Sequence, residues 1–128
     1  MKKFALMMFS VVTVLMLVAC GGSKVDDSTA EKYITKAEEI VSLMNAGDYE
    51  EVHAMFDEKM KEGLPLSDME ELTPVLNQSG DFEKINKSSV EEKDGFYITV
   101  LAANYSKENL VFTVSFNDND EVAGLFIQ

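Results

Sequence analysis

The chain has 128 residues, of which 23 are acidic and 11 basic, and every basic residue is a lysine. This excess of negative charge argues against a nucleic-acid partner, because phosphate binding needs clustered positive charge. Because the chain has no arginine, no guanidinium group is available for bidentate hydrogen bonding to a phosphate or carboxylate. The single cysteine, Cys20, excludes a disulfide within the chain.

The first twenty residues have the order of a lipoprotein signal. Lys2 and Lys3 precede an apolar run over residues 4–18, and Leu17-Val18-Ala19-Cys20 reads as a lipobox in which the small Ala19 precedes the cut. The run is shorter than the roughly 20 residues that span a bilayer, and a cleaved signal without lipidation would leave Cys20 unexplained. We therefore predict that residues 1–19 are removed and that acyl chains on Cys20 hold the protein at the extracytoplasmic face of the cell membrane.

Residues 20–27 are expected to form a lipidated tether, and residues 28–128 a single small domain. Removal of residues 1–19 takes away two lysines and no acid, so the charge of the mature chain is 9 − 23 = −14. A solvated acidic surface keeps an exported protein soluble. Cation capture is the alternative interpretation of the acidity.

A first helix is expected in the opening part of the domain. Ser28-Thr29-Ala30-Glu31 has the spacing of a capping box, and Gly47 is the expected end of the helix. Between them, apolar residues recur at steps of three and four and predict one buried stripe: Ala30, Tyr33, Ile34, Ala37, Ile40, Val41 and Met44.

Two further helices are expected before Gly80. The second begins at Asp48 and ends near Gly63, and the third begins at Ser67, with a kink or early end predicted at Pro74. Their expected inward residues are Val52, Met55, Phe56 and Met60 for the second helix, and Leu72, Val75 and Leu76 for the third.

From Phe82 onward the apolar period changes to two, which indicates strands. We expect strands over residues 82–93, 96–105, 109–116 and 121–128, with a tight turn at Asp94-Gly95. Three N-terminal helices packed on a four-stranded antiparallel meander make an α+β fold.

The pairing of these strands predicts two apolar faces. With Ser106–Asn109 as a loop, Tyr105 opposes Leu110 and Leu101 opposes Val114. The face that the helices should cover then carries Tyr97, Leu101, Ala103, Tyr105, Leu110, Phe112, Val114, Phe116, Leu125 and Ile127. The opposite face carries Phe96, Ile98, Val100, Val111, Val122 and Phe126. Such patches often mark partner surfaces, so homodimer formation through the open sheet is one hypothesis.

Several short motifs resemble the nuclear-transport-factor-2-like superfamily, the cone-shaped α+β fold shared with ketosteroid isomerase. The motifs are Gly47-Asp48-Tyr49-Glu50, Met55-Phe56-Asp57, Leu64-Pro65-Leu66 and the hairpin Phe116–Leu125. Within the superfamily, the chain is most similar to a bacterial family of uncharacterised domains, found alone in lipoproteins or joined to an α/β-hydrolase. The resemblance covers about residues 30–128 and implies a cone-like fold, but no activity.

Two polar patterns contain residue types that could take part in catalysis or metal binding. His53, the only histidine, lies four residues from both Tyr49 and Asp57, so the three share one side of the expected helix. An Asp-oriented general base is one interpretation, and a surface His–Asp pair is the one we favour, because no nucleophile stands beside it. Asn117–Glu121 is similar to the start of a calcium loop but lacks the required glycine and final glutamate, which favours a hairpin turn.

A pocket between the first helix and the sheet is the candidate ligand site, with core filling as the alternative. Its candidate lining is Tyr33, Tyr97, Leu101, Tyr105 and Phe112. The inward face carries no Asp or Glu except Glu121 at its rim, whereas isomerase-type chemistry in this fold requires an internal carboxylate base. No catalytic residue, metal or cofactor is therefore predicted.

We expect a non-catalytic lipoprotein that binds a small ligand or a protein partner at the membrane surface. One alternative is a cone-pocket enzyme of isomerase or hydrolase type, using Tyr105 or His53 with a nearby acid. The other is a structural assembly module that acts through the outer sheet face. A polar cavity would favour ligand or substrate binding, and a filled cone would favour assembly.

Overall fold

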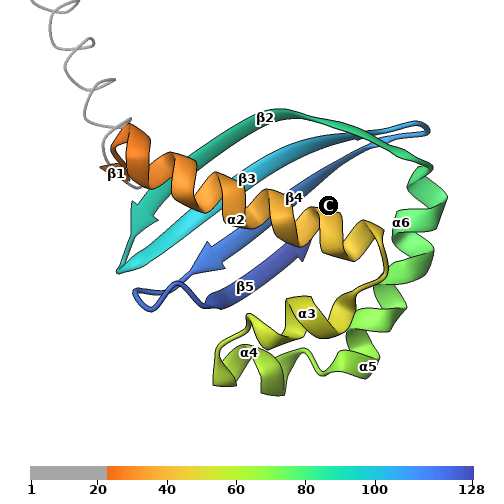
Figure 1. The fold of residues 1–128 in the computed structure, drawn as a ribbon, viewed down its shortest axis with the longest axis horizontal. Helices are drawn as coiled ribbons and strands as arrows, with labels where there is room; N and C mark the ends of the chain where they lie inside the picture. Colours follow the sequence, from red (N-terminus) through yellow and green to blue (C-terminus); the bar gives the residue numbers. More distant parts are fainter. Residues whose placement is uncertain (1–22) are drawn as a thin grey trace, which may run out of the picture.

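The computed structural model describes residues 23–128, so the predicted signal peptide and Cys20 lie outside the described residues. One antiparallel sheet has the strand order β1-β2-β3-β4-β5, and helix α2 crosses one of its faces (Figure 1). The strands are β1 (Ser23–Lys24), β2 (Phe82–Lys93), β3 (Phe96–Tyr105), β4 (Asn109–Phe116) and β5 (Val122–Ile127). Among residues 23–128, no helix has the length and apolarity that a membrane span requires.

Helix α2 (Asp27–Asn45) covers the inner face of the sheet. Its predicted stripe is confirmed, because Tyr33, Ala37 and Met44 are buried together with Ile40 and Val41. The helix begins just after Asp26, two residues before the expected Ser28 cap, and the Ser28 hydroxyl donates a hydrogen bond of 2.6 Å to the Asp26 carboxylate. It ends before Gly47, whose φ of +81° is the left-handed conformation that glycine adopts after a helix.

The expected second helix is divided into α3 (Tyr49–Ala54) and α4 (Glu58–Gly63). The cause is a contact with β5. Phe56 forms a parallel bridge with Val122, while the Asp57 amide donates to the Val122 carbonyl at 2.9 Å and the Val122 amide donates to the Met55 carbonyl at 2.8 Å. These bonds to a distant strand take the place of helical bonds, so the prediction of one continuous helix was wrong.

The expected third helix is also divided, into α5 (Leu66–Met69), a 3₁₀ turn (Glu70–Leu72) and α6 (Thr73–Ser79). Pro74 lies in the first turn of α6, where a missing amide hydrogen costs little, so it starts a helix and does not kink one. Leu76 is buried as expected, but Val75 is exposed and its predicted inward position was wrong.

Strands β2, β3 and β4 have the predicted bounds. Asp94 and Gly95 both have positive φ, as a two-residue hairpin turn of type I′ requires. The register of β3 on β4 differs by two residues from the expected one: Leu101 pairs with Phe112, because the Tyr105 amide donates to the Glu108 carbonyl at 2.9 Å and closes the loop earlier. A shift of two keeps every side chain on its predicted face.

A β-bulge changes one face assignment in β5. Ser115 pairs with Gly124 and Phe116 pairs with Val122, so Ala123 is the extra residue between them. The bulge turns Val122 inward, where it is buried, and the prediction that Val122 lies on the outer face was wrong.

The predicted inner face forms the core with α2. Leu101, Phe112 and Phe116 are buried, as are four others of the predicted set, and the remaining three pack against them half-buried. The four are Ala103, Tyr105, Leu110 and Val114, and the three are Tyr97, Leu125 and Ile127. One addition to the sheet was not expected: β1, within the predicted tether, pairs with Glu91 and Glu92 of β2.

Candidate functional site

The predicted internal pocket residues lie in the packed layer between α2 and the sheet. Tyr33 stacks on Tyr97 with ring centroids 4.5 Å apart, and the ring of Tyr105 lies 6.5 Å from that of Phe112. Four of the five are buried, and Tyr97 is half-buried. None of them lines any of four hollows that open at the surface of residues 23–128. Their role as a ligand site stays a prediction.

The two inner phenols are engaged by protein partners. The Tyr105 hydroxyl donates to the Asn45 side-chain oxygen at 2.6 Å, and burial raises the pKa of Tyr105. The Tyr33 hydroxyl donates to the Asp120 carboxylate at 2.5 Å, and burial together with this carboxylate raises the pKa of Tyr33. Tyr105 therefore has an amide partner rather than the acid that the enzyme alternative needs.

The acidic turn after β4 is held by its own side chains and by α2. The Asn117 side-chain oxygen accepts from the amides of Asn119 and Glu121 at 2.9 and 3.0 Å, as in an Asx turn. Asp120 bonds Tyr33 and forms an ion pair with Lys32 at 2.7 Å. Within residues 23–128, no three His, Cys, Asp or Glu side chains are grouped as a metal site would require.

His53 and Asp57 are not brought together as expected. Asp57 lies beyond the helix break, where its carboxylate caps α4 by accepting from the Met60 amide at 2.8 Å. His53 packs against Phe56 with ring centroids 5.3 Å apart, and its Nε2 atom is buried without a hydrogen-bond partner in the described part of the chain. The general-base interpretation thus loses its orienting carboxylate.

The outer face of the sheet is the most distinctive surface of the molecule. Strands β3, β4 and β5 contain no charged residue, although 27% of the chain is charged. Neighbouring residues form rows across this face, one of them Val100, Thr113 and Phe126. Phe126 is 65% exposed and Phe96 is 41% exposed. We use the name outer face for the outward residues of these three strands: Phe96, Ile98, Val100, Ala102, Asn104, Asn109, Val111, Thr113, Ser115, Gly124 and Phe126. On the same side of the sheet, β2 borders the outer face with four charged residues: Lys84, Lys87, Glu91 and Lys93.

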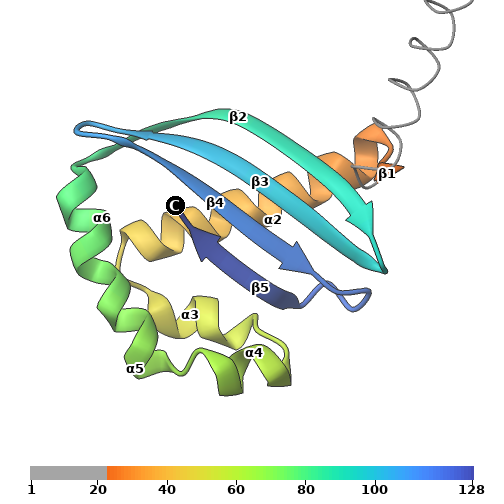
Figure 2. The ribbon, with the colours of Figure 1, turned by 180° about the vertical axis from the view of Figure 1, so that it is seen from behind.

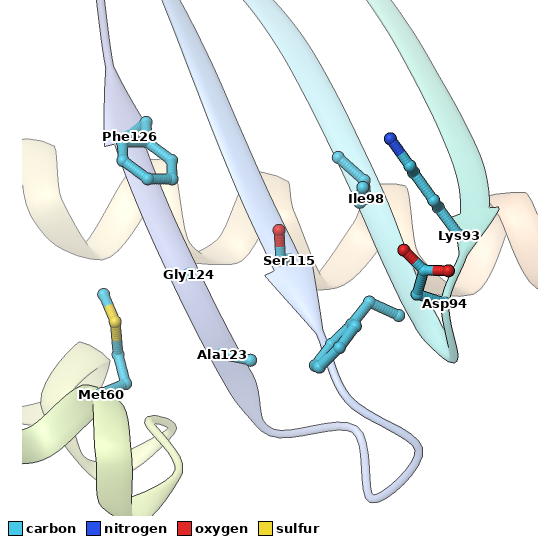
Figure 3. A pocket seen from close by; sticks show the side chains of 9 residues that line it. Met60, Lys93, Asp94, Ile98, Ser115, Ala123, Gly124 and Phe126 are labelled. Atoms are coloured by element: carbon cyan, nitrogen blue, oxygen red, sulfur yellow. The ribbon is translucent and has the colours of Figure 1, made fainter. Parts of the chain in front are cut away.

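A hollow of about 400 Å³ lies on the outer face (Figure 3). Its lining is Met60, Lys93, Asp94, Phe96, Ile98, Ser115, Ala123, Gly124 and Phe126. Small residues on β4 and β5 leave the space open: a Cβ atom on Gly124 would stand 3.5 Å from the Ser115 side chain. Met60 reaches the rim from α4, which lies against β5 because of the Phe56–Val122 bridge.

Two further hollows open near this one. A hollow of about 480 Å³ shares Phe96 and Ala123 with it and is bounded by Asp57, Glu58, Lys59 and Asn117. Another, of about 300 Å³, lies farther along the sheet and is lined by Lys87, Ser88 and Ser89 of β2 together with Val100, Ala102 and Val111. Sequence alternation predicted most of the outer face, but the hollow depends on the bulge at Ala123 and on Met60, for which no local signal exists.

The fourth hollow is acidic. It measures about 320 Å³ and is lined by Asp48, Glu50, Glu51 and Glu70 with Gly47, Tyr49 and Leu66. A cluster of carboxylates is the expected solvated surface of so acidic a chain, so we assign it no chemistry.

Comparison with known proteins finds one family profile and a similar solved structure. A family profile described as "Protein of unknown function (DUF3887)" matches residues 37–125. An NMR structure of a protein from Ruminococcus gnavus ATCC 29149 is similar, with a TM-score of 0.66 and 16% identity, over 82% of this chain and 96% of that one. At this identity the similarity shows the fold alone. No curated protein matches the chain.

Proposed function

The chain belongs to the DUF3887 family of proteins of unknown function, and we propose that it is a lipid-anchored binding module at the extracytoplasmic face of the cell membrane. The anchor is proposed from the lipobox and from Cys20, the only cysteine. The binding surface is proposed to be the outer face and its hollow.

One observation carries the choice of surface: three strands without a charged residue present exposed aromatic rings and a mostly apolar hollow, on a chain of strong negative charge. Full burial of a phenylalanine side chain is worth roughly 1.5–3 kcal/mol. Because Phe126 and Phe96 are exposed on the uncovered face, much of this burial free energy is not realised for them. A ligand or partner with an apolar surface would recover it, which is the usual meaning of such a patch.

A non-catalytic role has more support than the enzyme alternative. Lys93 and Asp94, at the rim, are the only titratable residues in the lining of the apolar hollow. The residues considered for catalysis lack a suitable partner, because Tyr105 bonds an amide and His53 is separated from Asp57 by the helix break. The outer face offers shape and apolar surface rather than a nucleophile or a base.

We also infer that the fold is of the nuclear-transport-factor-2-like, cone-shaped type. Its support is the element order, with helices before a meander of long strands, and a long helix lying across a curved sheet (Figures 1 and 2). An experimental structure of this chain that aligned poorly with such folds would remove the inference.

The proposed surface is testable with a neutral apolar dye such as N-phenyl-1-naphthylamine. We expect the protein to bind the dye and Phe126→Ser to weaken binding about fivefold to tenfold, since losing part of a phenylalanine contact costs about 1–1.4 kcal/mol. Val75→Ser is the matched control, because Val75 is also an exposed apolar residue but lies on α6. Equal dye affinity of the parent and Phe126→Ser would place binding elsewhere.

A further inference from the structure

The apolar hollow lies at the end of the sheet where the chain comes from its proposed anchor. Ser23 of β1 pairs with Glu92, and the next residues of the chain, Lys93 and Asp94, are part of the hollow's lining. In Figure 2, β1 lies beside the end of β2 that leads into the β2–β3 turn. Three peptide units separate Cys20 from Ser23, a distance of at most about 11 Å. Acyl chains on Cys20 would therefore enter the bilayer close to the hollow.

The distribution of charge also favours this side of the molecule. Of the 23 acidic residues, 13 lie between residues 27 and 79, in the helical segment, whereas β3, β4 and β5 carry none. Moving a carboxylate into an apolar environment is strongly unfavourable unless the charge is paired. On the same side of the sheet, β2 adds three lysines (Lys84, Lys87 and Lys93) and one acid (Glu91), and Asp94 follows at the turn. A bilayer contact through the outer face thus brings far fewer carboxylates to lipid than a contact through the helical segment would.

From these observations we propose that the outer face rests on the bilayer that holds the protein, with Phe96 and Phe126 at the boundary between headgroups and acyl chains. The proposal rests on the lipid anchor proposed above and names the bilayer as the partner of the same surface. Aromatic and aliphatic side chains on one face, bordered by lysines, suit that boundary. The anchor keeps the face at a high effective concentration near lipid, so a modest apolar contact suffices.

This kind of contact has a distinctive dependence on charge. Most peripheral proteins use lysine and arginine to bind anionic lipid, and salt weakens their binding. Here the apolar face supplies the attraction, and the net charge of the mature chain, 9 − 23 = −14, outweighs the three lysines that β2 places beside that face. We expect contact with neutral phosphatidylcholine to persist at high salt, and anionic phosphatidylglycerol to weaken it at low salt.

A single tryptophan can report the contact, because the chain contains none. The lipidated Phe126→Trp protein, purified from membranes, is placed in phosphatidylcholine vesicles with and without brominated acyl chains. We expect its emission to shift to the blue and to lose most of its intensity with brominated lipid, and both effects to persist at high salt. Glu39→Trp is the control, since Glu39 is exposed on the side of α2 away from its buried stripe, and its emission should not change.

The outcomes separate this proposal from the proposed function. Vesicle flotation first establishes whether the protein is anchored, and protein that does not float overturns both proposals. Anchored protein whose Phe126→Trp emission is not quenched overturns the bilayer contact and leaves the anchor intact. Blue-shifted emission that resists quenching and grows with protein density would mean that a second copy covers the face, which also overturns the bilayer contact. Equal quenching of Phe126→Trp and Glu39→Trp would exclude a specific orientation.

Discussion

Thr99 is fully buried on the inner side of β3, and its hydroxyl has no hydrogen-bond partner among the described residues. A buried polar group without a partner costs about 1–3 kcal/mol, whereas valine has nearly the same shape and no hydroxyl. We expect Thr99→Val to raise the free energy of unfolding by about 1 kcal/mol, measured by urea denaturation. Thr113→Val, on the outer side of β4, is the control and should change stability by less than about 0.5 kcal/mol. A less stable Thr99→Val protein would contradict the prediction.

The bonds of Asp120 attach α2 to the turn between β4 and β5. The bonds from Lys32 and Tyr33 hold the pKa of Asp120 below its usual range. A carboxyl group whose pKa is lower in the folded state adds stability above its unfolded pKa, near 3.8, and loses it as the pH falls through the folded value. Asp120→Asn should therefore reduce the melting temperature at pH 7. Between pH 5 and pH 2, the melting temperature of this variant should decrease less steeply than that of the parent protein.

Asparagine accepts the positive φ of Asp120, so the substitution adds no backbone strain. Asp118→Asn is the matched control, since Asp118 is exposed in the same turn and forms neither of these two bonds. A melting curve for Asp120→Asn that falls with acid as steeply as that of Asp118→Asn would show that the contact does not link folding to pH.

Local sequence patterns predicted those helices and strands whose bounds depend on interactions between neighbouring residues. The bounds of β2, β3 and β4 follow from period-two alternation and from the Asp94-Gly95 turn, both of which are properties of neighbouring residues. The helix break after Ala54 could not be found this way. Its cause is the bridge from Phe56 to Val122, 66 residues farther along the chain, and apolar spacing alone continues through the break.

The same distinction applies to the candidate site. Alternation predicted an apolar outer face that includes Phe96 and Phe126, and both are exposed there. It failed at Val122, because a one-residue bulge reverses the alternation locally. The hollow itself requires α4 to bring Met60 beside β5, and no short window of sequence encodes that contact.

For the whole molecule, the anchor and the outer face are expected to contribute differently to membrane attachment. Each buried methylene of an acyl chain contributes roughly 0.8 kcal/mol, so two or more chains on Cys20 would hold the protein stably, whereas the apolar face alone would not. We expect Cys20→Ser to leave the membrane fraction or to stay unprocessed, and Phe126→Ser to remain membrane-bound despite its weakened face. Cell fractionation and intact-mass measurement of both variants test this.

The two variants together separate attachment from contact. A Cys20→Ser protein that stays in the membrane fraction with the mature mass of the parent would contradict the lipid anchor. If Phe126→Ser were released from the membrane fraction, the outer face would be needed for attachment itself. That result would contradict the expectation that the acyl chains alone attach the protein. If only Cys20→Ser is released, the acyl chains attach the protein and the outer face is left to orient the domain on the bilayer, with the acidic helices directed away from the lipid.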